Sequence, residues 1–360
     1  MPSNARLTRR ALLTAAGTII ATRAQTGSAV PPEFKRYADA ATEIAVSRLT
    51  DPAHASMLPA WHLNAVLRRG HALLYSNDRT GQVQVYRMDL KSGESHQLTE
   101  GDPVNASAMT LLPGEREFAY IAGRSLMVQA VKPARPREVY RTPDEFEPTG
   151  GLTVSHDGTF AVIAEKGTAK WRLRKVLLNR GSTGGETIVE SIDDIRDPMA
   201  RPGGNDVLYR QNGNELRLAP SDRLLVTTTG PAIWSSDGAS ILYLSIPTDP
   251  AQPNTIRTFD VATLKDSLIS STSRFVSFGR NADATVFVGA SASKASPAVL
   301  LLLRSVRREL TLCEHRASDP SMVMPRFTPD SQRVLFQSDK NGHMAIYAVD
   351  VERFVEQTDD

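Results

Sequence analysis

The chain of 360 residues lacks several features on which common functional sites are built. Cys313 is its one cysteine, so the sequence permits neither an internal disulfide nor a Cys-x-x-Cys motif. It contains no nucleophile elbow and no phosphate-binding loop. The formal net charge is only +2, and no basic stripe is interleaved with aromatic residues. These absences argue against nucleic acid and against an anionic membrane as partners.

Apolar runs long enough to span a membrane are also missing, and a run of about ten apolar residues lies near the N-terminus. Arg9 and Arg10 precede about ten apolar residues, too few to span a bilayer. We therefore predict a twin-arginine signal peptide over residues 1–24, cleaved and not a membrane anchor, and a periplasmic or secreted protein. The alternative is a disordered start on a cytoplasmic protein, because Arg23 lies unusually close to the expected cleavage site.

What the sequence does have is a repeat. Residues 73–99 and 325–350 share short alternating strands separated by turn residues. A tight turn marks each copy, at Arg69-Gly70, Pro113-Gly114, Asp157-Gly158, Gly203-Gly204, Asp237-Gly238, Asp283-Ala284 and Asp330-Ser331. The steps between these turns are 44, 44, 46, 34, 46 and 47 residues. A period of roughly 40 to 50 residues with four strands per unit is typical of a β-propeller.

The sequence thus predicts an all-β fold, a seven-bladed β-propeller of four-stranded antiparallel blades. The short step of 34 residues indicates a fourth blade without long outer loops or without part of a strand. Residues 43–50 resemble the fourth strand of a blade, so we expect this N-terminal strand to complete the last blade and remove an exposed edge. The predicted organisation is a signal peptide (1–24), a linker (25–42), the propeller (43–355) and a tail (356–360).

Functional residues are expected where the innermost strands begin, because these segments meet at one mouth of the central channel. The polar residues there are His54, Asn105, Glu145, Glu147, Asp197, Arg201, Arg274, Ser277 and Asp319. The two arginines can grip a carboxylate in a bidentate way. We predict a carboxylate-bearing ligand with His54, Asn105, Asp197, Arg201 and Asp319 as its binding residues. Each of them also suits the ordinary role of capping a strand or holding water.

The histidines do not form a metal site by spacing, and only His54, His62 and His315 can reach this mouth. Met322 and Met324 flank Val323, and with His315 they allow a soft copper(I) site as one interpretation. Methionines at alternate strand positions are more often apolar filling. The sequence therefore predicts no metal and no other cofactor.

Several landmarks occur in order along the chain. They are residues 48–50, Tyr86 with Asp89-Leu90, residues 97–101, Asp197-Pro198 with Arg201-Pro202, Trp234 with residues 236–238, Val288-Gly289, and residues 325–330 with Ser338-Asp339. The turns resemble the TolB-type propeller repeat. The landmarks together more closely resemble the oligogalacturonate lyases, seven-bladed propellers that cleave short pectin fragments by β-elimination. The resemblance implies a protein that acts on or binds pectin-derived oligogalacturonides.

The same resemblance implies a divalent metal such as manganese held mainly by histidines, a histidine base and a nearby arginine. The family's His-Pro-His-Pro segment is Met-Val-Met-Pro at residues 322–325 here. The glutamine that stands just before that segment in the family is replaced by Asp319. The family's further metal histidine falls on Ser277, and its base falls on Pro231. The arginine is matched by Arg201, the one predicted catalytic residue. Losing a base or a metal commonly costs a factor of about 100 or more each.

Two other interpretations stay open. In the first, the site is relocated, with Arg201 holding the carboxylate and His54 or His62 as the base. In the second, the protein is a non-catalytic TolB-type propeller that binds a protein or peptide at the channel mouth. An apolar rim would favour this second interpretation, and its candidates are Met57, Leu58, Trp61, Met322 and Met324.

Overall fold

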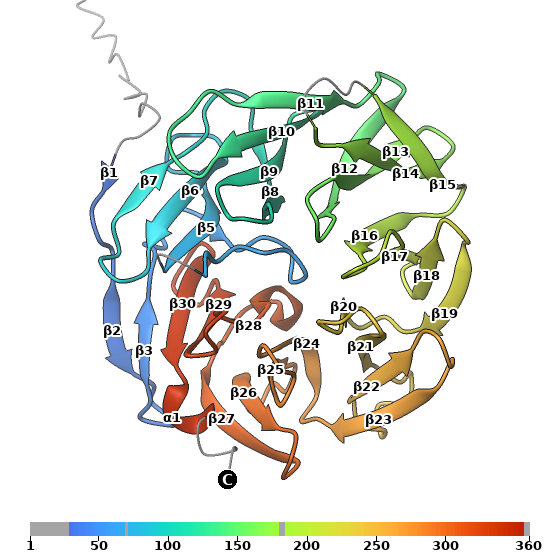
Figure 1. Ribbon diagram of the computed structural model, residues 1–360. Helices are drawn as coiled ribbons and strands as arrows, with labels where there is room; N and C mark the ends of the chain where they lie inside the picture. The colour runs from blue at the N-terminus through green and yellow to red at the C-terminus, as the bar shows by residue number, and fades with distance from the viewer. Residues whose placement is uncertain (1–28, 69–70, 180–183, 356–360) are drawn as a thin grey trace, which may run out of the picture.

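The computed structural model describes residues 29–68, 71–179 and 184–355. Their strands form seven antiparallel sheets arranged around a central channel (Figure 1). This confirms the predicted all-β, seven-bladed propeller. The signal peptide (1–24), the tail (356–360) and the first predicted turn, Arg69-Gly70, lie outside the described residues.

The first three blades follow the chain from an innermost to an outer strand. Blade I contains β4 (Ser56–Met57), β5 (Ala72–Asn77), β6 (Gln84–Asp89) and β7 (Ser95–Gln97). Blade II contains β8 (Val104–Leu111), β9 (Glu117–Ala122), β10 (Ser125–Ala130) and β11 (Arg137–Arg141). Blade III contains β12 (Phe146–Val154), β13 (Phe160–Gly167), β14 (Trp171–Leu177) and β15 (Gly185–Ser191).

The next three blades have the same order. Blade IV contains β16 (Ile195–Ala200), β17 (Val207–Gln211), β18 (Glu215–Ala219) and β19 (Arg223–Thr227). Blade V contains β20 (Ala232–Trp234), β21 (Ser240–Ser245), β22 (Thr255–Asp260) and β23 (Asp266–Ser271). Blade VI contains β24 (Phe275–Arg280), β25 (Val286–Ser291), β26 (Ala298–Leu303) and β27 (Arg308–Glu314). Blade IV keeps all four strands, so the short repeat step comes from its short connections.

Blade VII joins the two ends of the chain. It contains β28 (Arg326–Phe327), β29 (Arg333–Ser338) and β30 (Ala345–Asp350), and then β3 (Ala45–Arg48) and β2 (Lys35–Ala38) from the N-terminal side. β3 runs antiparallel to β30, with Val46 opposite Val349. β1 (Ala29–Val30) pairs with β7 at the outer edge of blade I. The segment predicted as a linker thus supplies two edge strands, because its extended backbone satisfies the open edges of blades I and VII.

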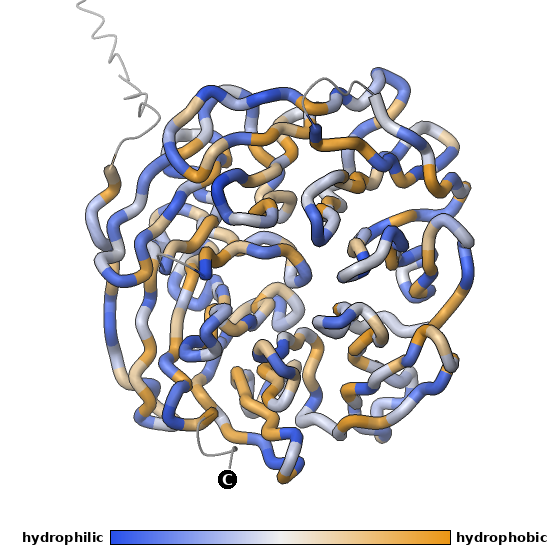
Figure 2. The backbone as a smooth tube through the Cα atoms, viewed as in Figure 1, coloured by the Kyte–Doolittle hydropathy of each residue, from blue (hydrophilic) through white to orange (hydrophobic). Residues whose placement is uncertain are grey.

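The apolar core is divided into seven clusters, and each lies between two neighbouring blades. Middle strands are covered on both faces and read as continuous apolar runs, as in β26, where all six residues are buried. Outer strands such as β23 are largely exposed, and only two of its six residues, Ile269 and Ser270, are buried. Figure 2 shows the resulting pattern, with hydrophobic stretches along the strands and hydrophilic ones at the loops. Packing of sheet faces around a ring therefore holds the fold together.

Among the residues that the structure describes, helical structure is confined to two short segments. A 3-10 helix, η1 (Pro320–Val323), precedes β28, and α1 (Glu352–Val355) follows β30. Within the described part of the chain, no helix has the length and apolar character needed to cross a membrane.

Candidate functional site

The starts of the innermost strands converge on one end of the channel, here called the strand-start mouth; the turns that follow these strands form the opposite turn face. Four predicted binding residues lie at this mouth. His54 precedes β4, Asn105 lies in β8, Asp197 lies in β16, and Asp319 caps η1 just before β28. The structure therefore brings these four residues to the same end of the innermost strands, where the sequence analysis expected them.

Three of the four make mainly local contacts. The Asn105 Oδ1 atom accepts bonds from the Ser107 amide and hydroxyl at 3.1 and 3.0 Å. The Asp319 Oδ1 atom accepts bonds from the Ser321 amide and hydroxyl at 2.9 and 2.7 Å. The His54 ring lies 3.9 Å from the Asp78 carboxylate and is 44% exposed. Asn105 and Asp319 thus serve as the backbone caps that the ordinary interpretation expected.

Arg201 lies elsewhere, and its prediction as the catalytic residue needs correction. It follows the end of β16, where the chain turns toward β17, whereas Asp197 lies near the start of that strand. Its Nε donates to the Gly238 carbonyl at 2.8 Å and its Nη1 to the Asp206 carboxylate at 3.0 Å. The guanidinium also lies 5.5 Å from the Trp234 ring centroid. β16 runs along the channel from the mouth to the turn face, so Arg201, which follows its last residue, lies on the turn face. These contacts hold it there.

The centre of the channel is filled by a segment that sequence analysis missed. Met57 pairs with Ser76, and Val66 bridges to Leu73. Between these two pairs the innermost segment of blade I has nine residue steps, from 57 to 66, whereas its partner β5 has three, from 76 to 73. The innermost segment therefore contains extra residues that do not pair with β5. Residues 58–64, here called the plug, form the excess. In Figure 1 they are the blue segment that reaches the middle of the ring.

The plug brings His62 beside Asp197. The His62 Nε2 atom lies 3.3 Å from the Leu152 carbonyl, which requires Nε2 to carry the proton. Its Nδ1 atom is enclosed and has no hydrogen-bond partner among the described residues. Burial lowers the pKa of His62, although the Asp197 carboxylate acts in the opposite direction. His62 is therefore a neutral imidazole at neutral pH, with a lone pair on Nδ1.

Arg210 is the arginine that meets Asp197. Its Nε donates to the Asp197 carboxylate at 3.3 Å and its Nη2 to the Gly230 carbonyl at 2.6 Å. Burial lowers the pKa of Arg210, and Asp197 partly offsets this. All five residues of β17 are buried, including this arginine. The sequence analysis missed Arg210, although a charged residue inside an otherwise apolar strand was a signal that could have found it.

Arg326 is a second buried cation beside the channel. It is 8% exposed and forms no ion pair with any described carboxylate. Its Nη1 and Nη2 donate to the carbonyls of Leu63 and Pro59 at 3.3 and 2.5 Å. Burial lowers its pKa to about 10, which leaves it charged at neutral pH. The centre of the channel thus holds two guanidinium groups, one carboxylate and a neutral imidazole.

Comparisons with known proteins agree on one family. The model of the oligogalacturonate lyase family matches residues 24–175, which end within β14. An oligogalacturonide lyase from Pectobacterium atrosepticum is 25% identical over 90% of this chain and 98% of its own. This chain is an oligogalacturonate lyase-like seven-bladed propeller.

The fold of the lyase-like propeller is shared with two solved structures. An oligogalacturonate lyase in complex with manganese has a TM-score of 0.83 at 23% identity, covering 92% of this chain and 99% of its own. An oligogalacturonate lyase from Vibrio parahaemolyticus has a TM-score of 0.81 at 22% identity, covering 92% of this chain and all of its own.

The lyase-like propeller does not offer a site that suits manganese. Among the described residues, no three histidine, cysteine, aspartate or glutamate side chains converge on one point. The residues at the matched positions are two thioethers, Met322 and Met324, with Ser277 and Asp319. Met324 is buried, the Ser277 hydroxyl is enclosed without a partner, and Asp319 is committed to capping η1. Hard divalent cations prefer oxygen and imidazole ligands, so this donor set does not fit the metal.

The copper interpretation and the apolar rim find no support in the geometry of the lyase-like propeller. The His315 Nδ1 atom accepts the Ala317 amide at 3.0 Å, and its Nε2 lies 3.0 Å from the Ser291 carbonyl, so neither nitrogen is free for a metal. Leu58 and Met324, two of the five rim candidates, are buried. The other three are half-buried, and none belongs to the exposed large hydrophobic residues of the described chain.

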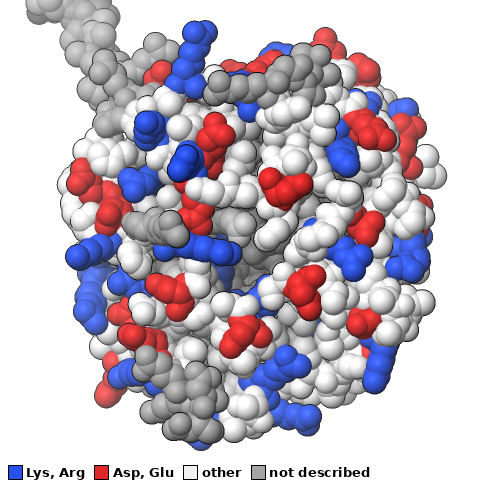
Figure 3. All heavy atoms as spheres, in the orientation of Figure 1, with Lys and Arg blue, Asp and Glu red and all other residues white. Residues whose placement is uncertain are grey.

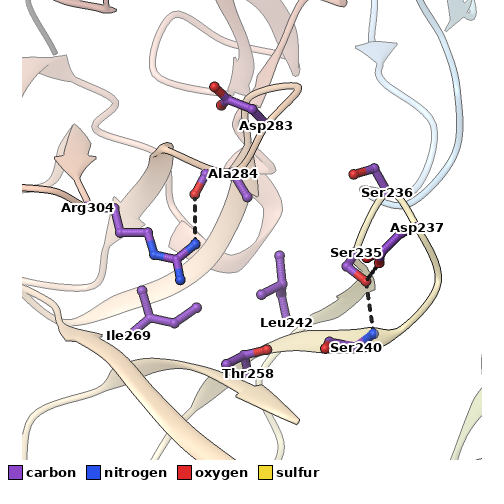
Figure 4. A pocket seen from close by; sticks show the side chains of 10 residues that line it. All are labelled: Ser235, Ser236, Asp237, Ser240, Leu242, Thr258, Ile269, Asp283, Ala284 and Arg304. Carbon is purple, nitrogen blue, oxygen red and sulfur yellow. Dashed lines mark hydrogen bonds between the residues drawn. The ribbon is translucent and has the colours of Figure 1, made fainter. Parts of the chain in front are cut away.

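Surface grooves lie between blades of the lyase-like propeller. One, of about 230 Å³, runs between blades V and VI (Figure 4), where the Ser235 hydroxyl donates to Asp237 and Arg304 donates to the Ala284 carbonyl. The first is a local turn bond and the second joins two segments of blade VI, and none of the residues that line the groove is an enclosed polar group without a partner. Figure 3 shows acidic and basic side chains mixed around the central hollow on the face in view. We therefore locate the candidate site in the channel, not in these grooves.

Proposed function

We propose that this protein binds pectin-derived oligogalacturonides at the strand-start mouth, without the manganese-assisted cleavage expected of the family. The observation that carries the proposal is the charge at the channel. Arg210 and Arg326 are both buried, and among the described residues only Asp197 balances them. A buried charge without a counter-ion is costly, so the carboxylate of a uronate ligand would gain from entering this field.

Two further observations support an acidic ligand. Arg274 is exposed at the start of β24 and forms no ion pair with the described residues, so it offers a cation at the mouth itself. The relatives that cover about nine-tenths of the chain are named as lyases of oligogalacturonides. Their substrate class is therefore the first to test here.

Binding is better supported than cleavage. β-Elimination next to a carboxylate needs a base and a cation that neutralises the developing charge. His62 is the neutral imidazole nearest to Asp197, but its Nδ1 atom is enclosed. His54 is accessible but lies beside Asp78 outside the buried charge cluster. His62 thus has the lone pair without the access, and His54 has the access but lies away from the buried arginines.

The decisive experiment is calorimetric titration of the mature protein with saturated di- and trigalacturonate, with and without manganese. The absorbance of the unsaturated uronate product is followed in parallel. We expect binding that manganese does not change and no product. Product that depends on manganese would contradict the metal-free proposal, and the absence of binding under every condition would contradict the ligand class.

The site of action follows from the leader sequence. We propose export through the twin-arginine route, on the strength of Arg9 and Arg10 before the short apolar run. Replacing both with lysine is expected to retain the protein in the cytoplasm in a fractionation assay. Unchanged export would remove the assignment.

A further inference from the structure

Trp61, at the centre of the plug, is held from two sides. Its Nε1 donates to the Ala232 carbonyl of blade V at 2.9 Å. The His62 ring packs edge-on against it, with 5.3 Å between centroids and 77° between planes. Ala232 is the first residue of β20, so the indole lies level with the start of that innermost strand. The side chain is half-buried, so part of the ring surface stays open.

The backbone of the plug is equally well fixed. The Ala60 amide donates to the Ser107 carbonyl of blade II at 3.0 Å, and His62 contacts Leu152 of blade III. Arg326 of blade VII binds the carbonyls of Pro59 and Leu63, near the two ends of the plug. The plug therefore contacts four blades other than its own, and one guanidinium joins its two ends.

We propose that one sugar ring of the ligand stacks on the indole of Trp61, and that Arg326 positions this indole by holding the backbone of the plug. This inference rests on the proposed function. The C–H face of a pyranose is apolar and matches an indole face, while the carboxylate of the same ring is drawn to the guanidinium groups beside the channel. The plug reaches across the channel to four other blades, so the ligand is placed at the strand-start mouth beside it.

The test uses the three tryptophans of the chain as reporters. Trigalacturonate should change the intrinsic fluorescence of the wild type and of Trp171→Phe, whose indole lies on the third strand of blade III. It should not change the fluorescence of Trp61→Phe. Trp61→Ala should bind about three- to tenfold more weakly by calorimetry, the size of a lost aromatic contact. Wild-type affinity in Trp61→Ala would overturn the stacking on Trp61.

These outcomes separate the inference from the function on which it rests. If the wild type binds no acidic sugar at all, the proposed function is wrong and the stacking on Trp61 falls with it. If the wild type binds and Trp61→Ala binds equally well, only the stacking is wrong.

The positioning role of Arg326 needs a readout of its own. Arg326→Met should speed hydrogen exchange at the Ala60 amide and weaken trigalacturonate binding as much as Trp61→Ala does. Arg326→Lys, which keeps the charge but cannot reach both carbonyls in one fork, serves if the methionine variant does not fold. The control is Arg333→Met on the neighbouring β29, whose guanidinium binds Asp350 and the Leu90 carbonyl. Unchanged exchange at Ala60 in both Arg326 variants would overturn this role.

Discussion

The two ends of the innermost strands are built by different rules. On the turn face one local arrangement recurs, in which an aspartate accepts bonds from the hydroxyl two residues before it and the amide two residues after it; it occurs at Asp157, Asp237 and Asp330. At the strand-start mouth Asn105 and Asp319 also make local caps, each to a serine two residues later, but the hydroxyl two residues before is not part of them. Asp197 and Arg274 have φ values of 51° and 58°, η1 precedes β28, and the plug contacts four other blades. The turn face is thus specified by neighbouring residues, whereas the mouth also depends on contacts between blades.

The largest expected change in stability comes from replacing a glycine by alanine at the mouth, compared with the same change on the turn face. A Cβ atom on Gly230, at the mouth, would lie 2.2 Å from the Leu244 carbonyl oxygen of the same blade. Gly230→Ala should therefore lower the free energy of unfolding by about 3 kcal/mol, as overpacking against backbone does. Urea denaturation measures the loss.

The matched control lies on the turn face. Gly114 has a φ of +88°, and no described atom lies within 4 Å of the place that a Cβ atom would take, so Gly114→Ala meets only backbone strain. That strain costs about 1 kcal/mol. Equal losses in the two variants would mean that Gly230 is no more tightly packed than Gly114.

The same difference explains what the sequence could predict. The turns repeat because each is satisfied within five residues, so their spacing revealed the ring and its number of blades. The plug left no such signal, since its contacts join residue 61 to residue 232 and residue 59 to residue 326. Arg201 and Arg210 show why the site residues could not be chosen from the sequence alone. Both are arginines of blade IV, and only the path of β16 through the channel shows which of them faces Asp197.

A second pair of variants sharpens the comparison through binding. Arg210→Lys keeps the charge but loses the fork that joins Asp197 to the Gly230 carbonyl. Its affinity for trigalacturonate should fall about tenfold, equivalent to about 1.4 kcal/mol. Arg201→Ala should leave this affinity unchanged and lower the free energy of unfolding by about 1 kcal/mol, because it loses its bonds on the turn face. The reverse order of affinities in calorimetry would return Arg201 to the site.

The smallest expected effect is a difference in the pH range over which each end loses stability. The pKa of His62 is lowered in the folded state, so the unfolded chain binds the proton more readily below about 6.5. Stability should therefore fall as the pH drops below about 6.5, by about 1.4 kcal/mol per unit at most, and His62→Gln should reduce that slope. His343→Gln, at an exposed position, is the control.

On the turn face, hydrogen bonds from Thr159 and Ser155 lower the pKa of Asp157 to about 2. Its stabilisation is present above the unfolded value of about 4 and is lost only as the pH falls toward 2, so Asp157→Asn should alter the stability curve there and not near neutrality. Urea midpoints measured from pH 7.5 to 2 separate the two windows. If His62→Gln and the wild type have the same slope between pH 6.5 and 5, the imidazole is not buried in the neutral form, and the plug does not hold it as the contacts with Leu152 require.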